Sequence, residues 1–565
     1  AVAYLEDRTT AYEAEVARAH EVNPVYGEIY RIVGSRAARA YRFPEAVSLV
    51  RRALQLNPDN TRAYADLGMH LLRTGDELGA REALDRSFED DPFDIVTYNL
   101  LQMMDQLSEF ETFEQGDLVV RIHPDEAPAL KEYVIETAQE ALDELTVRYG
   151  MTVQAPILVE VFPRHDDFAV RTLGLPGMLG ALGACFGNVV TLDSPRARPP
   201  GDFNWLSTLW HEMAHVVTLQ MSNQRLPRWL SEGISTYEEK RKHVAWGRDG
   251  VLDFAVALNE GSVLSIRDLN SGFTRPETIS LTYFQASILV EHLIDTHGMT
   301  AMQEILRGYG QGLETDEVLA RIGLDFDSLQ ASFDKAVEEQ FGELRLALEK
   351  PQQEIPSEGP EMLEVLRSIS ITDDGNFHVQ SALGQAALEA GEDEEARKAL
   401  ERAAILVPMA TGFDSPRGLL ARIAQAEGDQ ERAMRELEML LEYDETSIEA
   451  VRLYATLAEE TGDQLRLGQA YERLIEIDPF DPISHQVLGR MALEDGRTAL
   501  ATRELTVALA LDPVDRVAVH TDLAESLFLS RNFSQAKNQV MSALEIAPSY
   551  ERAQELLLAI IESEL

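Results

Sequence analysis

The sequence predicts a multidomain protein in which a central α+β domain is flanked by two all-α segments. The chain has 565 residues, which is too long for a single hydrophobic core. A repeating helix-turn-helix pattern occurs near both ends of the chain. Between these segments, short apolar strands and an amphipathic helix precede a His-Glu-x-x-His sequence.

The composition argues against several classes of partner. The net charge of −47 disfavours binding to nucleic acid or to an anionic membrane surface, both of which attract basic proteins. The sequence contains no run of eighteen apolar residues that would span a membrane. The only cysteine, Cys185, excludes an internal disulfide framework and a cysteine-rich metal site, and we expect it to be a small buried apolar residue.

Residues 1–104 are predicted to form a helix followed by helical repeats. Residues 1–26 are expected to be one helix that ends near Asn23 and Pro24. From about residue 27, equivalent residues recur thirty-four positions apart: Ala46, Val50, Ala53 and Pro58 are followed by Ala80, Leu84, Ser87 and Pro92. These positions resemble the tetratricopeptide repeat, in which small residues let paired helices pack closely. Residues 95–104 are expected to close this array.

Residues 105–345 are predicted to form the central α+β domain. Runs of β-branched and apolar residues predict strands at 118–122, 157–162 and 188–192. Amphipathic spacing predicts a helix over residues 126–149 and a short one over 166–173. The predicted order is strand, helix, strand, strand, and then the helix that carries the His-Glu-x-x-His sequence.

That sequence, His211-Glu212-Met213-Ala214-His215, is predicted to bind a metal ion. Residues four apart lie on the same face of a helix, so His211 and His215 can direct two imidazole nitrogens to one point. This arrangement suits Zn²⁺, and Glu212 is placed to take a proton from water rather than to bind the metal. A catalytic zinc ion also needs a third protein ligand and an open fourth position.

The third ligand is predicted to come from the next helix. The extended pattern H-E-x-x-H-x-x-G-x-x-H fails, because Thr218 and Met221 stand where it requires glycine and histidine. Ser222 to Gln224 instead predict a turn, and Pro227 precedes a helix that contains Glu232. The next helix contains the pattern W-L-x-E-G-x-x-x-Y-x-E, which resembles a segment of the gluzincin metallopeptidases. Its residues in this chain are Trp229, Leu230, Glu232, Gly233, Tyr237 and Glu239. By this resemblance, His211, His215 and Glu232 are zinc ligands and Glu212 is the general base.

The same resemblance implies two further site features. Tyr283 is expected near the start of a helix that ends at Gly298. It matches a tyrosine that stabilises the oxyanion in related aminopeptidases. The alternative is a packing role, which is common for a tyrosine at the start of a helix. The resemblance also implies that extended substrates add to the strand within Gly183 to Thr191, with Gly183, Ala184, Cys185, Phe186 and Gly187 as substrate-binding residues. The alternative is an ordinary edge strand. Residues 183–187 lack the G-x-M-E-N signature of zinc aminopeptidases, which favours endopeptidase action. His292 is expected to be a packing residue rather than a second oxyanion donor.

Residues 346–375 are predicted to be a linker, because Lys350 to Pro360 are rich in proline and polar residues. The repeat then returns in residues 376–565. Five units begin around Leu383, Leu420, Tyr454, Leu488 and Leu523, and residues 551–565 are expected to form a closing helix.

Together these features predict a zinc-dependent endopeptidase whose repeats recruit a polypeptide substrate or a protein partner. One alternative is a catalytically idle peptidase fold in which the repeats do the work, and another is an aminopeptidase. Similar repeat-bearing peptidases favour a bacterial periplasm or cell envelope over the cytoplasm. The chain begins at Ala1 without methionine, so a missing leader segment is left open.

Overall fold

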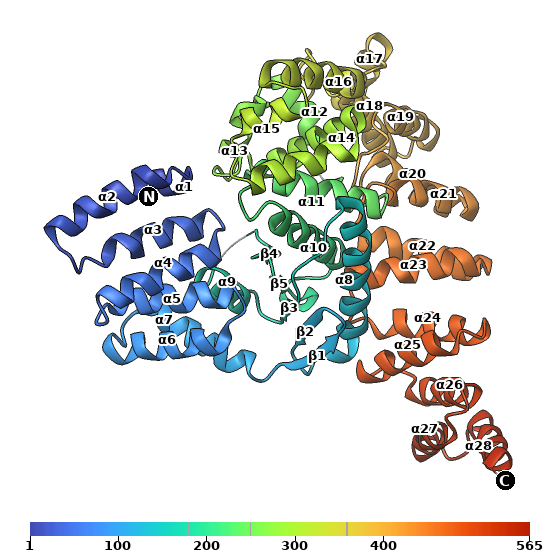
Figure 1. The fold of residues 1–565 in the computed structure, drawn as a ribbon. Coiled ribbons are helices and arrows are strands. Elements are labelled where there is room, and N and C mark those ends of the chain that lie inside the picture. The colour runs from blue at the N-terminus through green and yellow to red at the C-terminus, as the bar shows by residue number, and fades with distance from the viewer. Residues whose placement is uncertain (178–179, 249, 357–359, 565) are drawn as a thin grey trace. The chain divides into compact units, whose positions relative to one another are not determined.

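The computed structural model describes residues 1–177, 180–248, 250–356 and 360–564 (Figure 1). The chain divides into two compact units. The first comprises Ala1–Pro124, Tyr133–Ala197 and Leu206–Lys350, and the second comprises Asp125–Glu132, Arg198–Trp205 and Pro351–Leu565. The N-terminal helices and most of the central domain therefore share one unit. The prediction of four successive domains stays a prediction. Within the described residues, no helix combines the length and apolarity that a membrane span requires.

Seven helices precede the first strand in the described part of the chain: α1 (Val2–Leu5), α2 (Thr9–Val22), α3 (Glu28–Arg39), α4 (Phe43–Leu56), α5 (Thr61–Arg73), α6 (Glu77–Asp90) and α7 (Ile95–Leu107). The pairs α3–α4 and α5–α6 are the two predicted repeats, and α7 follows them. The prediction of one helix over residues 1–26 is wrong. The chain breaks at Asp7, whose φ of 51° is left-handed and cannot continue a right-handed helix.

The central sheet has five strands in the order β1-β2-β3-β5-β4. The strands are β1 (Glu111–Gln115), β2 (Leu118–Ile122), β3 (Ile157–Phe162), β4 (Gly183–Cys185) and β5 (Val189–Asp193). Strands β2, β3 and β5 run parallel, and β1 and β4 are antiparallel edge strands. Each of the three predicted strands is present within one residue of its expected bounds. The short strands β1 and β4 complete the sheet.

The helices of the central segment are α8 (Ala127–Tyr149), α9 (His165–Leu173), α10 (Trp205–Met221), α11 (Arg228–Lys242), α12 (Val251–Glu260), α13 (Leu269–Gly272), α14 (Ile279–Gly310), α15 (Thr315–Arg321) and α16 (Phe326–Ala347), with 3-10 turns η1 (Pro195–Ala197) and η2 (Ile266–Asp268). Helix α14 begins four residues before Tyr283. Gly298, with a φ of 80° and a ψ of 163°, is non-helical and separates two helices within this element, so the first of them ends at the predicted residue.

The second unit contains twelve helices in the described residues: α17 (Pro360–Thr372), α18 (Phe377–Glu389), α19 (Asp393–Leu406), α20 (Pro416–Glu427), α21 (Gln430–Leu441), α22 (Ile448–Thr461), α23 (Gln464–Ile477), α24 (Pro482–Glu494), α25 (Thr498–Ala510), α26 (Arg516–Leu529), α27 (Phe533–Ile546) and α28 (Glu551–Glu564). Helices α18 to α27 form the five predicted pairs, and α28 packs on the last pair (Figure 1). Residues 350–356 of the predicted linker contain no helix or strand, and residues 357–359 lie outside the described residues.

The N-terminal helices share their core with the central sheet. One buried cluster joins Leu72, Leu84 and Leu100 to Phe162 and Phe168 of the central domain. Another joins helices α3 and α4 to residues on either side of the β4–β5 turn. A fully buried ion pair adds to these contacts. The Arg171 guanidinium donates to Glu160 on β3 at 2.8 Å and to the carbonyl oxygen of Leu72 on α5 at 2.9 Å.

Candidate metal centre

Helices α10 and α11 carry the predicted metal ligands. Most of α10 is surrounded by protein, because Leu209, Trp210, Val216 and Val217 are fully buried. This burial fixes the rotation of the helix and therefore the direction of its polar face. Helix α11 is packed against α14 with no room for a side chain at Gly233, where a Cβ atom would lie 2.7 Å from the Ala286 carbonyl oxygen.

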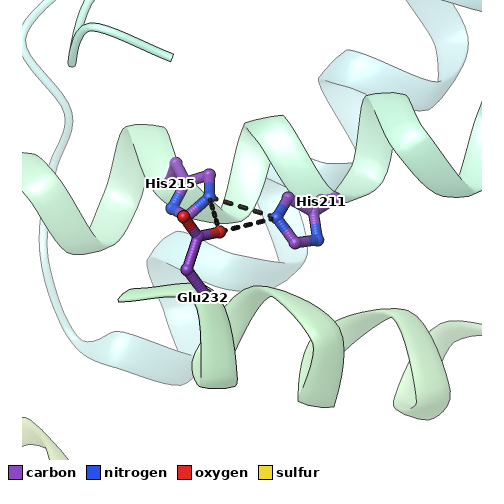
Figure 2. Close-up of side chains that lie close together, drawn as sticks. All are labelled: His211, His215 and Glu232. Atoms are coloured by element: carbon purple, nitrogen blue, oxygen red, sulfur yellow. Dashed lines mark hydrogen bonds and ion pairs between the residues drawn. The ribbon is translucent and has the colours of Figure 1, made fainter. Parts of the chain in front are cut away.

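The side chains of His211, His215 and Glu232 point toward one another (Figure 2). The Nε2 atoms of the two histidines are 3.1 Å apart, and Glu232 Oε2 is 3.3 Å from His211 Nε2 and 3.2 Å from His215 Nε2. Three ligands at tetrahedral positions around zinc, each about 2.05 Å from the ion, would be roughly 3.3 Å apart. Two imidazoles and a carboxylate in this triangle match both the chemistry and the spacing that zinc requires.

A further set of side chains orients the three ligands. His215 Nδ1 lies 2.9 Å from the Ser231 hydroxyl, and His211 Nδ1 is hydrogen-bonded to Glu239. The Ser207 hydroxyl donates to Glu239 at 3.1 Å. When a partner holds the Nδ1 atom of an imidazole, the Nε2 atom is directed to the metal. Glu239 belongs to the W-L-x-E-G-x-x-x-Y-x-E segment, but no sequence pattern predicts its contact with His211.

Glu232 is itself held by a cation. The Arg228 Nε atom donates to Glu232 Oε1 at 3.1 Å, which leaves Oε2 facing the histidines. Burial alone would raise the pKa of the Glu232 carboxyl. The hydrogen bonds from His211 and His215 outweigh burial and hold this pKa well below its usual range. No sequence motif includes Arg228, so its hydrogen bond to Glu232 could not be predicted from the sequence.

Glu212 lies next to the ligand triangle and has capacity to accept a proton. Its side chain is buried, and no described residue hydrogen-bonds to its Oε2 atom. Burial raises the pKa of Glu212, and the charges of His215 and His211 oppose this effect. A carboxylate with a raised pKa is a stronger base, as general-base catalysis near neutral pH requires.

Tyr283 lies close to His211. Its ring centroid is 6.2 Å from that of His211, and its edge-to-face contact with Phe273 has a centroid distance of 5.1 Å. Burial raises the pKa of Tyr283 well above its usual range, whereas a hydrogen bond from Arg228 lowers it only in part. The phenol therefore keeps its proton and can donate a hydrogen bond, in addition to its packing against Phe273.

Strand β4 passes directly over Glu212. A Cβ atom at Gly183 would lie 2.6 Å from Glu212 Oε1 and 2.7 Å from its Cγ, so a larger residue there would displace the Glu212 side chain. Leu182 and Phe186 hydrogen-bond to β5, and the antiparallel pattern alternates between them. The backbone groups of Gly183 and Cys185 therefore face the open edge of the sheet, and those of Ala184 face β5.

The last two residues of the predicted substrate segment, Phe186 and Gly187, form hydrogen bonds with other parts of the central domain. The carbonyl oxygens of Phe186 and Gly187 accept hydrogen bonds from Gln224 and Gln220. Burial raises the pKa of the Cys185 thiol well above its usual range, which suits the predicted apolar role. Away from the metal centre, His292 Nε2 is 2.9 Å from the Ser332 hydroxyl and its ring packs near Phe333.

Two family models match segments of this chain. Residues 137–339 match the family model described as Peptidase MA superfamily, and residues 37–103 match a tetratricopeptide repeat model. No curated protein matches the chain. The solved structures that match include the tetratricopeptide protein YrrB, at 13% identity, a TM-score of 0.26, and coverage of 34% of this chain and 97% of YrrB. Yeast Tom70 matches at 14% identity and a TM-score of 0.20, covering 95% of this chain and 96% of Tom70.

A complex of Naa15 and Naa10 bound to HypK-THB also matches, at 9% identity and a TM-score of 0.25, covering 99% of this chain and 90% of the matched chain. TM-scores this low do not establish a common overall fold. The two family matches together show that this chain carries a Peptidase MA superfamily domain and tetratricopeptide repeats.

Proposed function

We propose that the protein is a zinc-dependent peptidase that cleaves internal peptide bonds. The observation that carries this proposal is the convergence of His211, His215 and Glu232 within 3.3 Å of one another, beside the buried and partly unpaired carboxylate of Glu212. The match of residues 137–339 to the Peptidase MA superfamily supports it.

The residues of the site have separate roles in this proposal. Bound zinc supplies Lewis acidity, which activates water near neutral pH and polarises a carbonyl group. Glu212 accepts a proton from the attacking water and returns it to the leaving nitrogen. The Tyr283 phenol donates a hydrogen bond to the oxygen on which negative charge develops. Arg228 and Glu239 hold the ligands Glu232 and His211 in position.

The substrate is proposed to be an extended polypeptide. It would add as a strand to the open edge of β4, where the backbone groups of Gly183 and Cys185 are directed outward. The segment from Gly183 to Gly187 contains no carboxylate to hold a free amino terminus, so cleavage within a chain is favoured over removal of its first residue. The tetratricopeptide repeats are proposed to recruit the substrate or a protein partner.

Substitution of Glu212 by glutamine tests the proposal. Glu212→Gln is expected to keep stoichiometric zinc, measured by elemental analysis, and to lose casein cleavage by about 10³-fold because the general base is gone. Glu436→Gln is the matched control, since Glu436 is also buried but lies in the C-terminal repeats. Full activity in Glu212→Gln would refute the assigned role. Comparison of amino-terminally blocked and free peptides separates an endopeptidase from an aminopeptidase.

A second candidate function is a scaffold in which the peptidase fold is idle and the repeats bind proteins. It is favoured by the extent of the C-terminal repeats, which have buried cores of their own. Purified protein that contains zinc and cleaves neither casein nor blocked or free peptides would favour this second function.

A further inference from the structure

The turn between α10 and α11, residues 222–227, joins the two helices that carry the candidate metal ligands. Two of its residues, Asn223 and Gln224, have φ angles of 48° and 60°, in the left-handed region. Residues other than glycine adopt this conformation at a cost in free energy, and they keep it only where neighbouring contacts fix the chain. The side chains of the turn make such contacts with three separate parts of the first compact unit.

Two of these contacts hold the turn against the central domain. Asn223 Nδ2 donates to the Gly310 carbonyl oxygen, at the end of α14, at 2.9 Å. Gln224 Nε2 donates to the carbonyl oxygen of Phe186, which directly follows β4, at 3.1 Å. Gly187 leaves the space for this side chain, because a Cβ atom there would lie 2.6 Å from Gln224 Nε2. The turn is therefore fixed to both α14 and the end of β4.

The third contact comes from the N-terminal helices. Arg225 Nε donates to Asp7 Oδ2 at 3.1 Å, and Arg225 Nη2 donates to Glu45 Oε1 at 3.2 Å. Asp7 lies between α1 and α2, and Glu45 lies in the first turn of α4. The same guanidinium donates to the Asn223 carbonyl oxygen at 3.2 Å. One side chain thus joins the N-terminal helices to the backbone of the turn.

The two carboxylates that accept from Arg225 are also held by Arg42. This arginine is 4% exposed and pairs with Asp7 at 2.8 Å and with Glu45 at 2.7 Å. Burial would raise the pKa of Asp7 and of Glu45, but the hydrogen bonds and charges of the arginines outweigh it and hold both pKa values below their usual range. Both carboxylates are therefore charged at neutral pH, and two arginines share them.

We propose that Arg225 is a positioning residue for the metal centre and that the N-terminal helices act on that centre through it. By holding the turn to α4 and to the break between α1 and α2, Arg225 fixes the start of α11 relative to the end of α10. Glu232 lies one turn into α11, so its approach to the two histidines of α10 depends on this hold. This inference rests on the proposed function, because it concerns the metal ligands of that site.

The first test uses the full chain and reports on the metal ligands themselves. Co²⁺ is bound in place of Zn²⁺, and its visible absorption spectrum shows the arrangement of the ligands. Arg225→Met should alter this spectrum and weaken zinc binding about fivefold, measured by competition with a chromophoric chelator, because two partly buried ion pairs are lost. Arg225→Lys keeps the charge but not the planar fork, and it should weaken zinc binding by about half as much.

Arg18→Met is the matched control, because Arg18 pairs with Glu15 on the exposed surface of α2. It should bind both metals like the parent protein. Asp7→Asn combined with Arg225→Met should weaken zinc binding by less than the product of the two single effects, since both substitutions remove the same ion pair. Independent effects would overturn the inference, and so would an Arg225→Met variant with the spectrum and zinc affinity of the parent.

Amide hydrogen exchange over residues 222–232 separates this inference from the proposed function, because it requires no metal. Exchange there should be about fivefold faster in Arg225→Met than in Arg18→Met, with no change in the fully buried strand β3. Equal exchange in the two variants would overturn the inference, and so would an equal acceleration in β3, which would indicate a general loss of stability. If the parent protein binds no zinc, the proposed function fails, and the exchange series still decides whether Arg225 holds the start of α11.

Discussion

The two arrays of tetratricopeptide helices differ in what their buried surfaces contact. In the N-terminal array, Leu84 and Phe43 belong to clusters that also contain residues of the central sheet and α9. In the C-terminal array, the clusters consist of residues 355–560 throughout, as Leu437 and Leu505 illustrate. The same helix-turn-helix unit thus forms part of the core of the central domain in one place and a core of its own in the other.

This difference shows that repeat architecture alone does not determine the role of a repeat. An array that shares its core must keep its geometry for the adjoining domain to fold, whereas an array with its own core is stabilised by neighbouring repeats. The first arrangement fixes the N-terminal array against the sheet of the central domain. The second leaves repeat surfaces available for partners.

The largest expected effect comes from breaking the buried ion pair of Arg171 with Glu160, because the same arginine also donates to the Leu72 carbonyl oxygen of the N-terminal array. Arg171→Met should lower the free energy of unfolding by about 4 kcal/mol, because the buried Glu160 carboxylate loses its closest cation. Urea unfolding followed by loss of bound zinc measures the effect on the unit that contains the metal centre. Arg86→Met is the control, because Arg86 pairs with carboxylates only at the surface. An unchanged midpoint in Arg171→Met would contradict the shared core.

The second largest expected effect comes from leucine-to-alanine substitutions that create a similar cavity in the core of each array. Leu84 and Leu437 are both fully buried, so each substitution by alanine should cost about 3 kcal/mol of stability. Only Leu84→Ala should shift the urea transition at which zinc is released. Leu437→Ala should shift a transition recorded by helical circular dichroism and leave zinc release in place. If the two variants moved zinc release equally, the arrays would not differ as described.

The smallest expected effect concerns the metal centre alone. Glu239→Gln removes the negative charge that orients His211 and should weaken zinc binding about 10- to 100-fold. Competition with a chromophoric chelator gives this ratio directly. The Glu436→Gln variant in the C-terminal array should bind zinc like the unaltered protein. A Glu239→Gln variant with undiminished affinity would show that the hydrogen bond to His211 does not contribute to zinc binding.

The features that the sequence predicts well are those encoded by neighbouring residues. The repeat helices, strand β3 and the face shared by His211 and His215 follow from spacing along a single element. Glu232 could be predicted as the third ligand because its own helix carries a recognisable pattern. That α10 and α11 bring it to the two histidines followed from the family resemblance and not from residue periodicity.

The features that escaped prediction depend on contacts between distant segments. Asp7 breaks the first helix while pairing with Arg42 and Arg225, residues 35 and 218 positions away. Glu160 on β3 pairs with Arg171 on α9. No sequence motif predicts the hydrogen bond of Arg228 to Glu232. Periodicity describes which side of an element is buried, but not which element covers it.

Gly183 has a consequence for how this protein could be controlled. A single methyl group at this position would intrude on the Glu212 carboxylate, and glycine alone leaves the clearance. The position of this strand therefore sets the space that the Glu212 carboxylate can occupy. A movement of the strand toward α10 would displace that carboxylate, whereas His211, His215 and Glu232 would keep their places.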